Sequence, residues 1–199
     1  TLGALLCGGV LCIYDGSPSY PNLNAQWRFA SDKSIVHFGH GASFFIESMK
    51  NDLQDINENR LPKLKSIGST GSPLSEEAFY WLQKRLPRTQ LISMSGGTDV
   101  CSAFLGGNPN LPVYAGYLQC EMLGASIECW NEKGEKLKNQ TGELVITNPM
   151  PCMPTYFWGD TQNKIFKKSY FKKFKDVWTH GDWIQKSETK GIKILGRSD

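Results

Sequence analysis

The chain has 199 residues, of which 40% are hydrophobic and 12% aromatic. This length and apolar content predict a folded globular protein with one large core or two smaller ones. With 22 basic and 19 acidic residues and a net charge of +3, the balance excludes any prediction of nucleic-acid or membrane binding from charge alone.

The cysteines and the apolar opening of the chain bear on its location. Six cysteines are scattered without a CxxC pair, several of them in apolar runs. This usage favours a reducing compartment, so we expect a cytosolic protein. The opening LGALLCGGVLCIY lacks a basic flank, is interrupted by glycines and is too short to span a membrane. Because the chain starts without Met and stops at Asp199, we expect a piece of a longer protein.

Residues 1–113 alternate short β-rich runs with helical patterns. Buried strands are predicted where β-branched and aromatic residues cluster between turn signals, at residues 10–14, 34–38, 64–69 and 91–95. Helices are predicted at residues 22–32, 42–55 and 75–86, the last with Ser75 as N-cap and Glu76 and Glu77 in its first turn. The alternation predicts an α/β fold with a parallel sheet covered by helices, whose ligands bind beyond the carboxyl ends of the strands.

Residues 114–199 change to strands joined by tight turns. Strands are predicted at residues 124–130, 141–147, 177–185 and 191–197, with a turn at NEKG, residues 131–134. Between them, residues 160–174 carry Phe166, Tyr170 and Phe174 every fourth residue, which predicts one apolar helix face. We therefore expect an α/β subdomain over residues 1–113 and a smaller, β-rich, distorted barrel-like subdomain over residues 114–199.

A strand ends in the sequence SGGTD, residues 95–99. At the carboxyl edge of a parallel sheet, Gly96 and Gly97 would let a flat ligand lie against the backbone. Thr98 could then donate to a phosphate oxygen, and Asp99 could hold a Mg²⁺ that the phosphates share. Taken alone, these residues favour the simpler interpretation of an ordinary strand-to-turn junction.

Three further features permit nucleotide chemistry. The small-residue loop GSTGSPLS, residues 68–75, precedes a helix and offers unpaired N–H groups to an anion or a base, although a tight turn with a capped helix needs the same residues. Asp182, beside a glycine in an apolar strand, would be stabilised by ribose hydroxyls, or else lies on a hairpin turn. Arg197 could reach the same ribose or a phosphate, although most arginines are simply exposed.

Two other patterns invite weaker hypotheses. His37 and His40 are three apart on a predicted strand and have no accompanying ligand cluster, which argues against zinc, while His40 can still line a pocket. The lysines between residues 164 and 175 alternate with apolar residues at helical spacing. A solvated helix face explains them better than nucleic-acid binding, which would be strongly salt-dependent.

The order of these motifs along the chain is more specific than any one of them. The small-residue loop, SGGTD, GELVIT, HGD and GRSD together resemble the adenylate-forming superfamily of acyl-CoA synthetases, peptide-synthetase adenylation domains and luciferases. The runs SGGTDVCSAFLGGNPNLPVYAGYLQCEMLG and NPMPCMPTYFWGD are similar to the acetoacetyl-CoA synthetase family in particular. The resemblance implies part of the large N-terminal domain of a two-step ligase. Acetoacetate and ATP would give acetoacetyl-adenylate and pyrophosphate, and CoA would then displace AMP.

The resemblance also implies roles for individual residues. The loop of Gly71, Ser72 and Pro73 would pack against adenine, and the run Met94, Ser95, Gly96 and Gly97 would form a floor for the nucleotide and acyl group. Thr98 would contact the α-phosphate, and Asp99 would help bind Mg²⁺ where relatives carry Glu, so Thr98 and Asp99 are the implied catalytic residues. Asp182 would bind the ribose hydroxyls beside Arg197, and Asp199 would be the hinge of a small C-terminal domain.

The acyl pocket is expected to differ from that of acetate-specific relatives, which place a Trp where this chain has Gly96. We expect Thr70 and Gly96 to border the acyl chain, with Thr70 donating to the β-keto oxygen and His40 near the substrate. In a full-length enzyme, Gly96→Trp is then expected to shift preference toward acetate.

The upstream phosphate loop and the C-terminal domain with its catalytic lysine, both found in the family, have no counterpart in this sequence. We therefore expect the isolated 199-residue chain to form no acyl-adenylate. Two alternatives stay open: a synthetase for another short or medium acyl group, and a non-catalytic nucleotide-binding module of the same fold.

Overall fold

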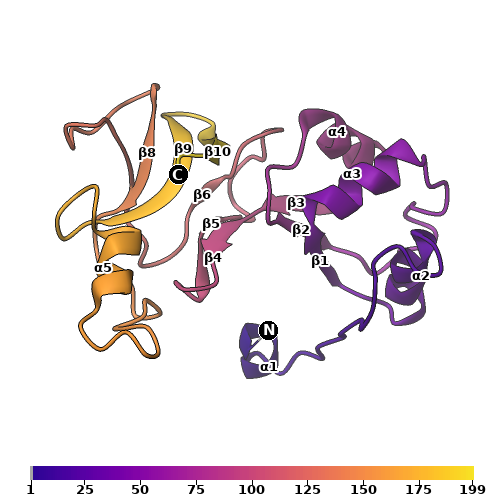
Figure 1. The fold of residues 1–199 in the computed structure, drawn as a ribbon. Helices are drawn as coiled ribbons and strands as arrows, with labels where there is room; N and C mark the ends of the chain where they lie inside the picture. The colour runs from indigo at the N-terminus through magenta and orange to yellow at the C-terminus, as the bar shows by residue number, and fades with distance from the viewer. Residues whose placement is uncertain (1) are drawn as a thin grey trace.

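The first half of the chain forms a parallel sheet with helices packed against it. The structure is a computed structural model that describes residues 2–199. Its first sheet has the order β1-β2-β3, from β1 (His37–Gly41), β2 (Ser66–Thr70) and β3 (Gln90–Ser93), all parallel. The accompanying helices are α2 (Asn24–Asp32), α3 (Ala42–Lys50) and α4 (Glu76–Arg85). The predicted α/β architecture is thus confirmed (Figure 1).

Helix α4 begins where the sequence predicts. Ser75 has extended backbone angles, and its side chain accepts a hydrogen bond from the backbone N–H of Ala78 at 3.2 Å. Glu76 and Glu77 follow in the first turn, where carboxylates are stabilised by the helix dipole. The cap fixes the end of the loop that leads out of β2.

The second half of the chain is built from two antiparallel sheets. One has the order β4-β5-β6, from β4 (Ser95–Gly97), β5 (Ser102–Gly106) and β6 (Cys120–Glu121). The other has the order β10-β9-β8-β7, from β7 (Ile127–Trp130), β8 (Thr141–Ile146), β9 (Trp178–Ser187) and β10 (Gly191–Arg197). The β-rich prediction is confirmed, but over residues 2–199 the sheets stay open rather than closing into a barrel.

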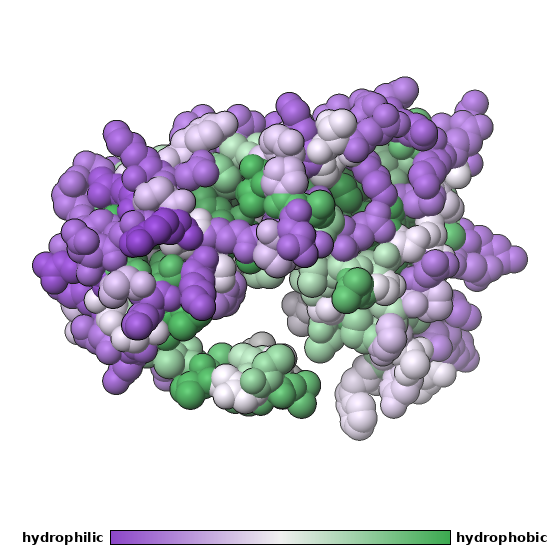
Figure 2. Space-filling view, turned by 180° about the vertical axis from the view of Figure 1, so that it is seen from behind, coloured by the Kyte–Doolittle hydropathy of each residue, from purple (hydrophilic) through white to green (hydrophobic). Residues whose placement is uncertain are grey.

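Residues 10–14 are not a strand, which contradicts the sequence prediction. They follow the short helix α1 (Leu2–Leu6). Val10 is 90% exposed and Ile13 is 74% exposed. A strand needs a neighbour to accept its backbone hydrogen bonds, and no strand in the described residues pairs with this segment. Figure 2 shows the resulting apolar surface on the arm that carries α1.

Two other predicted elements have different bounds. The first parallel strand begins at His37 rather than at residue 34, because Ser34 has a left-handed φ of 51° after the end of α2. The helix predicted over residues 160–174 is limited to α5 (Lys164–Tyr170). Phe166 and Tyr170 share its packed face, but Phe174 lies beyond it and packs edge-to-face on Trp130.

The hydrophobic residues form two cores. The first lies between the parallel sheet and its helices and includes Trp27, Phe45 and Leu82. The second includes Leu144 and Ile184 of the four-stranded sheet, together with residues of the β4–β5 hairpin, Val100, Phe104 and Leu105. The β4–β5 hairpin therefore packs with the second core, whereas Val113 and Ala115 pack against the first, and the subdomain boundary at residue 113 stays a prediction. None of the helices within residues 2–199 has both the length and the apolar character needed to cross a bilayer.

Candidate functional site

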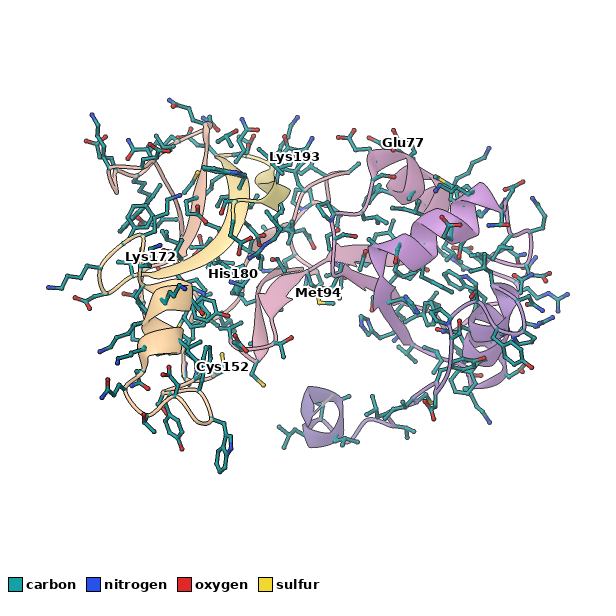
Figure 3. The ribbon with its side chains drawn as sticks, viewed as in Figure 1. Glu77, Met94, Cys152, Lys172, His180 and Lys193 are labelled. Carbon is teal, nitrogen blue, oxygen red and sulfur yellow. The ribbon has the colours of Figure 1, made fainter. Side chains whose placement is uncertain are left out.

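Two adjoining cavities lie beside the β4 strand, the first between the two halves of the molecule and the second within the second half. The first, of about 400 Å³, is lined by the loop after β2, by the junction of β3 and β4, and by residues of β9 and β10. The second, of about 810 Å³, is lined by the β4–β5 hairpin, by α5 and by the end of β10. They share Gly96, His180 and Arg197. Met94 and His180 are labelled at this junction in Figure 3.

The carboxyl end of the parallel sheet forms one side of the first cavity. Thr70 ends β2, and the loop of Gly71, Ser72 and Pro73 follows it before α4. Gly71 has a φ of 82°, which a residue with a side chain adopts only at a cost. The four residues line the cavity together, as expected for a ligand site beyond the strand ends of an α/β sheet.

The run from Met94 to Gly97 crosses from one sheet to another. β3 ends at Ser93, and β4 begins at Ser95 as an antiparallel partner of β5, with an irregular register between Ser95 and Gly96. The sequence predicts that the strand ends at the glycines, but Gly96 and Gly97 are part of β4 and the turn follows at residues 98–101. Met94, Ser95 and Gly96 line the first cavity.

The need for glycine at position 96 is explained by the neighbouring strand rather than by a flat ligand. A Cβ atom added to Gly96 would lie 2.1 Å from the carbonyl oxygen of Ser102 and 2.8 Å from the Cα of Ala103. A Trp side chain at this position would thus be directed at the backbone of β5. The expected route from Gly96→Trp to a smaller acyl pocket does not follow from this geometry.

Asp182 and Arg197 face each other across two antiparallel strands. They are register partners in β9 and β10, and an Nη1 of Arg197 donates to Oδ1 of Asp182 at 3.3 Å. Asp182 is only 8% exposed, and burial raises the pKa of its carboxyl group, while His180 and Arg197 act in the opposite direction. Asp182 lies within a strand, so the hairpin-turn alternative is wrong.

Arg197 also binds the predicted hinge residue. Its Nε donates to Oδ1 of Asp199 at 2.9 Å and its Nη2 donates to Oδ2 at 2.5 Å. This fork of two hydrogen bonds raises the pKa of Arg197 and lowers that of Asp199. Arg197 thus connects Asp182 in the first cavity with Asp199 in the second.

The second cavity contains Gly97, Thr98 and Asp99. Oδ2 of Asp99 accepts a hydrogen bond of 2.5 Å from the hydroxyl of Tyr170 on α5. Tyr170 stacks on Trp178 with ring centroids 3.6 Å apart, and burial together with the Asp99 contact raises the pKa of its hydroxyl. The lysines predicted as a solvated helix face are exposed, yet three of them line this cavity: Lys168, Lys172 and Lys173.

The structure adds two buried titratable groups that the sequence interpretation missed. Glu143 is only 1% exposed, and its carboxylate accepts hydrogen bonds from Lys173 Nζ at 2.8 Å, from Ser198 Oγ at 2.8 Å and from the backbone N–H of Gly181 at 3.2 Å. His180 lines both cavities. A carboxylate inside the apolar run GELVIT was the signal for Glu143, and the motif HGD, which also contains Asp182, was the signal for His180.

His40 is the predicted site residue that lies elsewhere. Its ring stacks on Phe44 at 4.1 Å, and its Nδ1 accepts the backbone N–H of Gly41 at 2.8 Å. It belongs to β1, at the edge of the sheet away from β3, and lines neither cavity.

Within residues 2–199, no group of three or more His, Cys, Asp or Glu side chains is arranged to hold a metal ion.

Comparisons with known proteins show which family the chain resembles. The chain is 40% identical to acetoacetyl-CoA synthetase of Gallus gallus over 98% of its length, and 39% identical to that of Rhizobium meliloti (strain 1021) over 98%. It covers 30% of the length of each of these relatives. The solved acetoacetyl-CoA synthetase from Streptomyces lividans superposes with a TM-score of 0.92 at 39% identity, covering 100% of this chain and 31% of that one.

A more distant structure shows the same fold. The anthranilate CoA ligase AuaEII, solved in complex with anthranoyl-AMP, superposes with a TM-score of 0.80 at 14% identity, over 96% of this chain and 35% of that one. The family model described as AMP-binding enzyme matches residues 1–157. The chain therefore belongs to the AMP-binding enzyme family.

Proposed function

We propose that the two cavities bind ATP and the acyl-adenylate formed from it, as the nucleotide site of an AMP-forming acetoacetate–CoA ligase. The observation that carries the proposal is the convergence of the 71–73 loop, Asp182, Arg197 and Thr98 on two connected cavities. The named relatives are acetoacetyl-CoA synthetases of which this chain spans about a third. The ligase activity is accordingly proposed for the longer protein.

Each cavity suits one part of the nucleotide. In the first, Asp182 is a buried carboxylate that can accept both hydroxyls of a ribose, and the loop of Gly71, Ser72 and Pro73 offers a flat surface to adenine. In the second, Thr98, Lys168 of α5 and Lys172 just beyond it can donate to phosphate oxygens. Adenylation replaces a poor leaving group by AMP, so positioning and charge stabilisation are sufficient and no nucleophilic side chain is required.

Asp99 fits the proposed Mg²⁺ ligand in one respect. It is a single exposed carboxylate on the turn of the β4–β5 hairpin, and Mg²⁺ is commonly held by one or two carboxylates together with substrate phosphates. Oδ2 of Asp99 accepts from Tyr170, and Oδ1 is the oxygen we assign to the ion. When bound, Mg²⁺ would neutralise phosphate charge during adenylation.

For the acyl group we propose the space between Thr70 and Gly96, both of which line the first cavity. Thr70 would donate to the β-keto oxygen of acetoacetate, and CoA would attack the adenylate in the second step. A synthetase for another short acyl group would share every contact described above. Comparing the activity with acetoacetate and with other short acids, in the longer protein, separates these two functions.

We also propose a cytosolic location, supported by six cysteines that are all free thiols.

The proposal is tested by measuring the affinity for AMP by calorimetric titration, for the native chain and for the Asp182→Asn variant. Because Asn loses the charge that strengthens hydrogen bonds from the ribose, AMP affinity should fall about tenfold to a hundredfold. Asp176→Asn is the matched control, since Asp176 is exposed and lies at neither cavity. Absence of AMP binding to the native chain, or equal affinity in Asp182→Asn, would overturn the proposal.

A further inference from the structure

His180 is built into the wall between the two cavities. It lies on β9, two residues before Asp182, and lines both cavities. Its side chain is only 9% exposed. In Figure 3 it is labelled beside β9, between the labels of Lys172 and Met94. A side chain in this place contacts the ribose-side and the phosphate-side of the proposed site at once.

The orientation of the imidazole is fixed by its neighbours. Trp178 Nε1 donates to His180 Nδ1 at 3.4 Å, and Phe104 packs edge-to-face on the ring at 4.6 Å between centroids. On a third side lies Gly97, where an added Cβ would come within 3.1 Å of His180 Cε1. The absence of a side chain at Gly97 therefore leaves room for the ring.

This orientation points one ring nitrogen at Asp182. Since Nδ1 accepts from Trp178, the neutral ring carries its proton on Nε2. Nε2 lies 3.7 Å from Oδ2 of Asp182, a close polar contact that is longer than a hydrogen bond, and the backbone of Gly96 also contacts the ring. Oδ1 of the same carboxylate accepts from Arg197 at 3.3 Å. The two oxygens of Asp182 thus face different partners, and His180 faces the one that Arg197 leaves open.

We propose that His180 is a positioning residue that orients the Asp182 carboxylate for the two ribose hydroxyls, and thereby sets the preference of the site for ribonucleotides. The inference rests on the proposed nucleotide site and adds a residue to it. Burial holds the pKa of His180 below its usual value, against the opposing influence of Asp182. The lowered pKa favours the neutral ring, whose N–H dipole faces Asp182 across 3.7 Å without adding a second cation beside Arg197.

The test compares the affinities for AMP, 2′-deoxy-AMP and 3′-deoxy-AMP, measured by calorimetry on the native chain and on His180→Phe. Phe keeps a ring in the wall but has no N–H for Asp182. We expect AMP affinity to fall about tenfold while the affinity for each deoxynucleotide changes much less, so that the preference for AMP is lost. His180→Gln restores an N–H donor and should recover part of that preference.

A purely structural role predicts a different pattern. If His180 only fills the wall, His180→Phe will weaken all three nucleotides by the same factor, and that result would overturn the inference. Phe104→Leu is the matched control, because it loosens the same wall without touching Asp182, and it should keep the native ratio. If the native chain binds no AMP, the proposed function itself fails, which is distinguishable from an unchanged ratio.

Discussion

Gly96 shows how a single residue can belong to a site through its backbone. It lines both cavities, yet the direction in which its side chain would extend is filled by Ser102 and Ala103 of the neighbouring strand. A glycine next to a site is easily attributed to the ligand, because both a ligand and a close strand require a bare backbone. Only the strand pairing distinguishes the two causes.

We predict that Gly96→Ala destabilises the chain by about 2 kcal/mol or more, because its Cβ cannot avoid the Ser102 carbonyl without moving β5. Chemical denaturation measures the loss. Gly39→Ala is the control, since Gly39 also lies in a strand but its Cβ would meet only an ordinary contact of 3.7 Å. Similar free energies of unfolding for the two variants would contradict the assigned role of the β4–β5 pairing.

Some site residues could be predicted from the sequence because they are anomalous where they stand. Asp182 is a carboxylate in an apolar strand, and the structure places it in a cavity beside Arg197. Glu143 is the same kind of anomaly and was missed, because its three partners come from distant segments. His40 borders neither of the two cavities described, because a strand pattern does not reveal which strand lies at the sheet edge, and its place near the substrate stays a prediction.

At the scale of elements, α5 is held by a few aromatic contacts rather than by burial. None of its residues is buried. A helix of one to two turns is not stable by itself in water, so its attachment decides whether it forms. Tyr170 stacks on Trp178 and also donates to Asp99, which links the helix to the β4–β5 hairpin.

We predict that Tyr170→Ala releases α5 and raises the rate of tryptic cleavage within residues 164–175 about fivefold or more, because the stacking contact is lost. Tyr170→Phe keeps the ring and loses only the hydroxyl, so its cleavage rate should stay within about twofold of the native rate. Mass spectrometry of the fragments locates the cleaved lysines. Equally raised rates in the two variants would show that the hydrogen bond to Asp99, and not the stacking, holds the helix, and native rates in both would show that neither contact does.

Elements whose signals are local were predicted well. The Ser75 cap lies within one turn of its helix, and the alternating strands of the second half carry their own turn signals. Residues 10–14 failed because strand formation depends on a partner, and a strand-like composition does not supply one. The predicted end of α5 was wrong because Phe174 has the spacing of a helix face but packs on Trp130 instead.

Across the whole molecule, the proposed site lies at the meeting of two cores. The parallel sheet supplies the loop after β2 and the antiparallel sheet supplies Asp182, while the hairpin between them packs with the second core. The sequence predicted both halves from their contrasting patterns. It could not predict the change of packing partner near residue 95, because β3 and β4 are separated by Met94 alone and no turn residues mark the passage from one sheet to the other.

All three histidines share one electrostatic feature of the folded chain. Burial lowers the pKa of His37, His40 and His180 below the value of an exposed imidazole. Below about pH 6.5 the unfolded chain therefore binds protons that the folded chain does not. The stability that these neutral rings contribute is present above this pH and is lost as the pH falls toward their lowered values.

We predict that the free energy of unfolding falls between pH 7.5 and pH 5.5, as followed by urea denaturation at each pH. His180→Gln should reduce the slope most, because its ring is the most enclosed of the three, by up to about 1.4 kcal/mol per pH unit. Carboxylates of lowered pKa, such as Asp52, titrate below this window, whereas the raised pKa of Asp182 opposes the trend in both variants. A pH slope that is unchanged in His180→Gln would mean that the ring is already protonated, or already hydrated, in the folded protein.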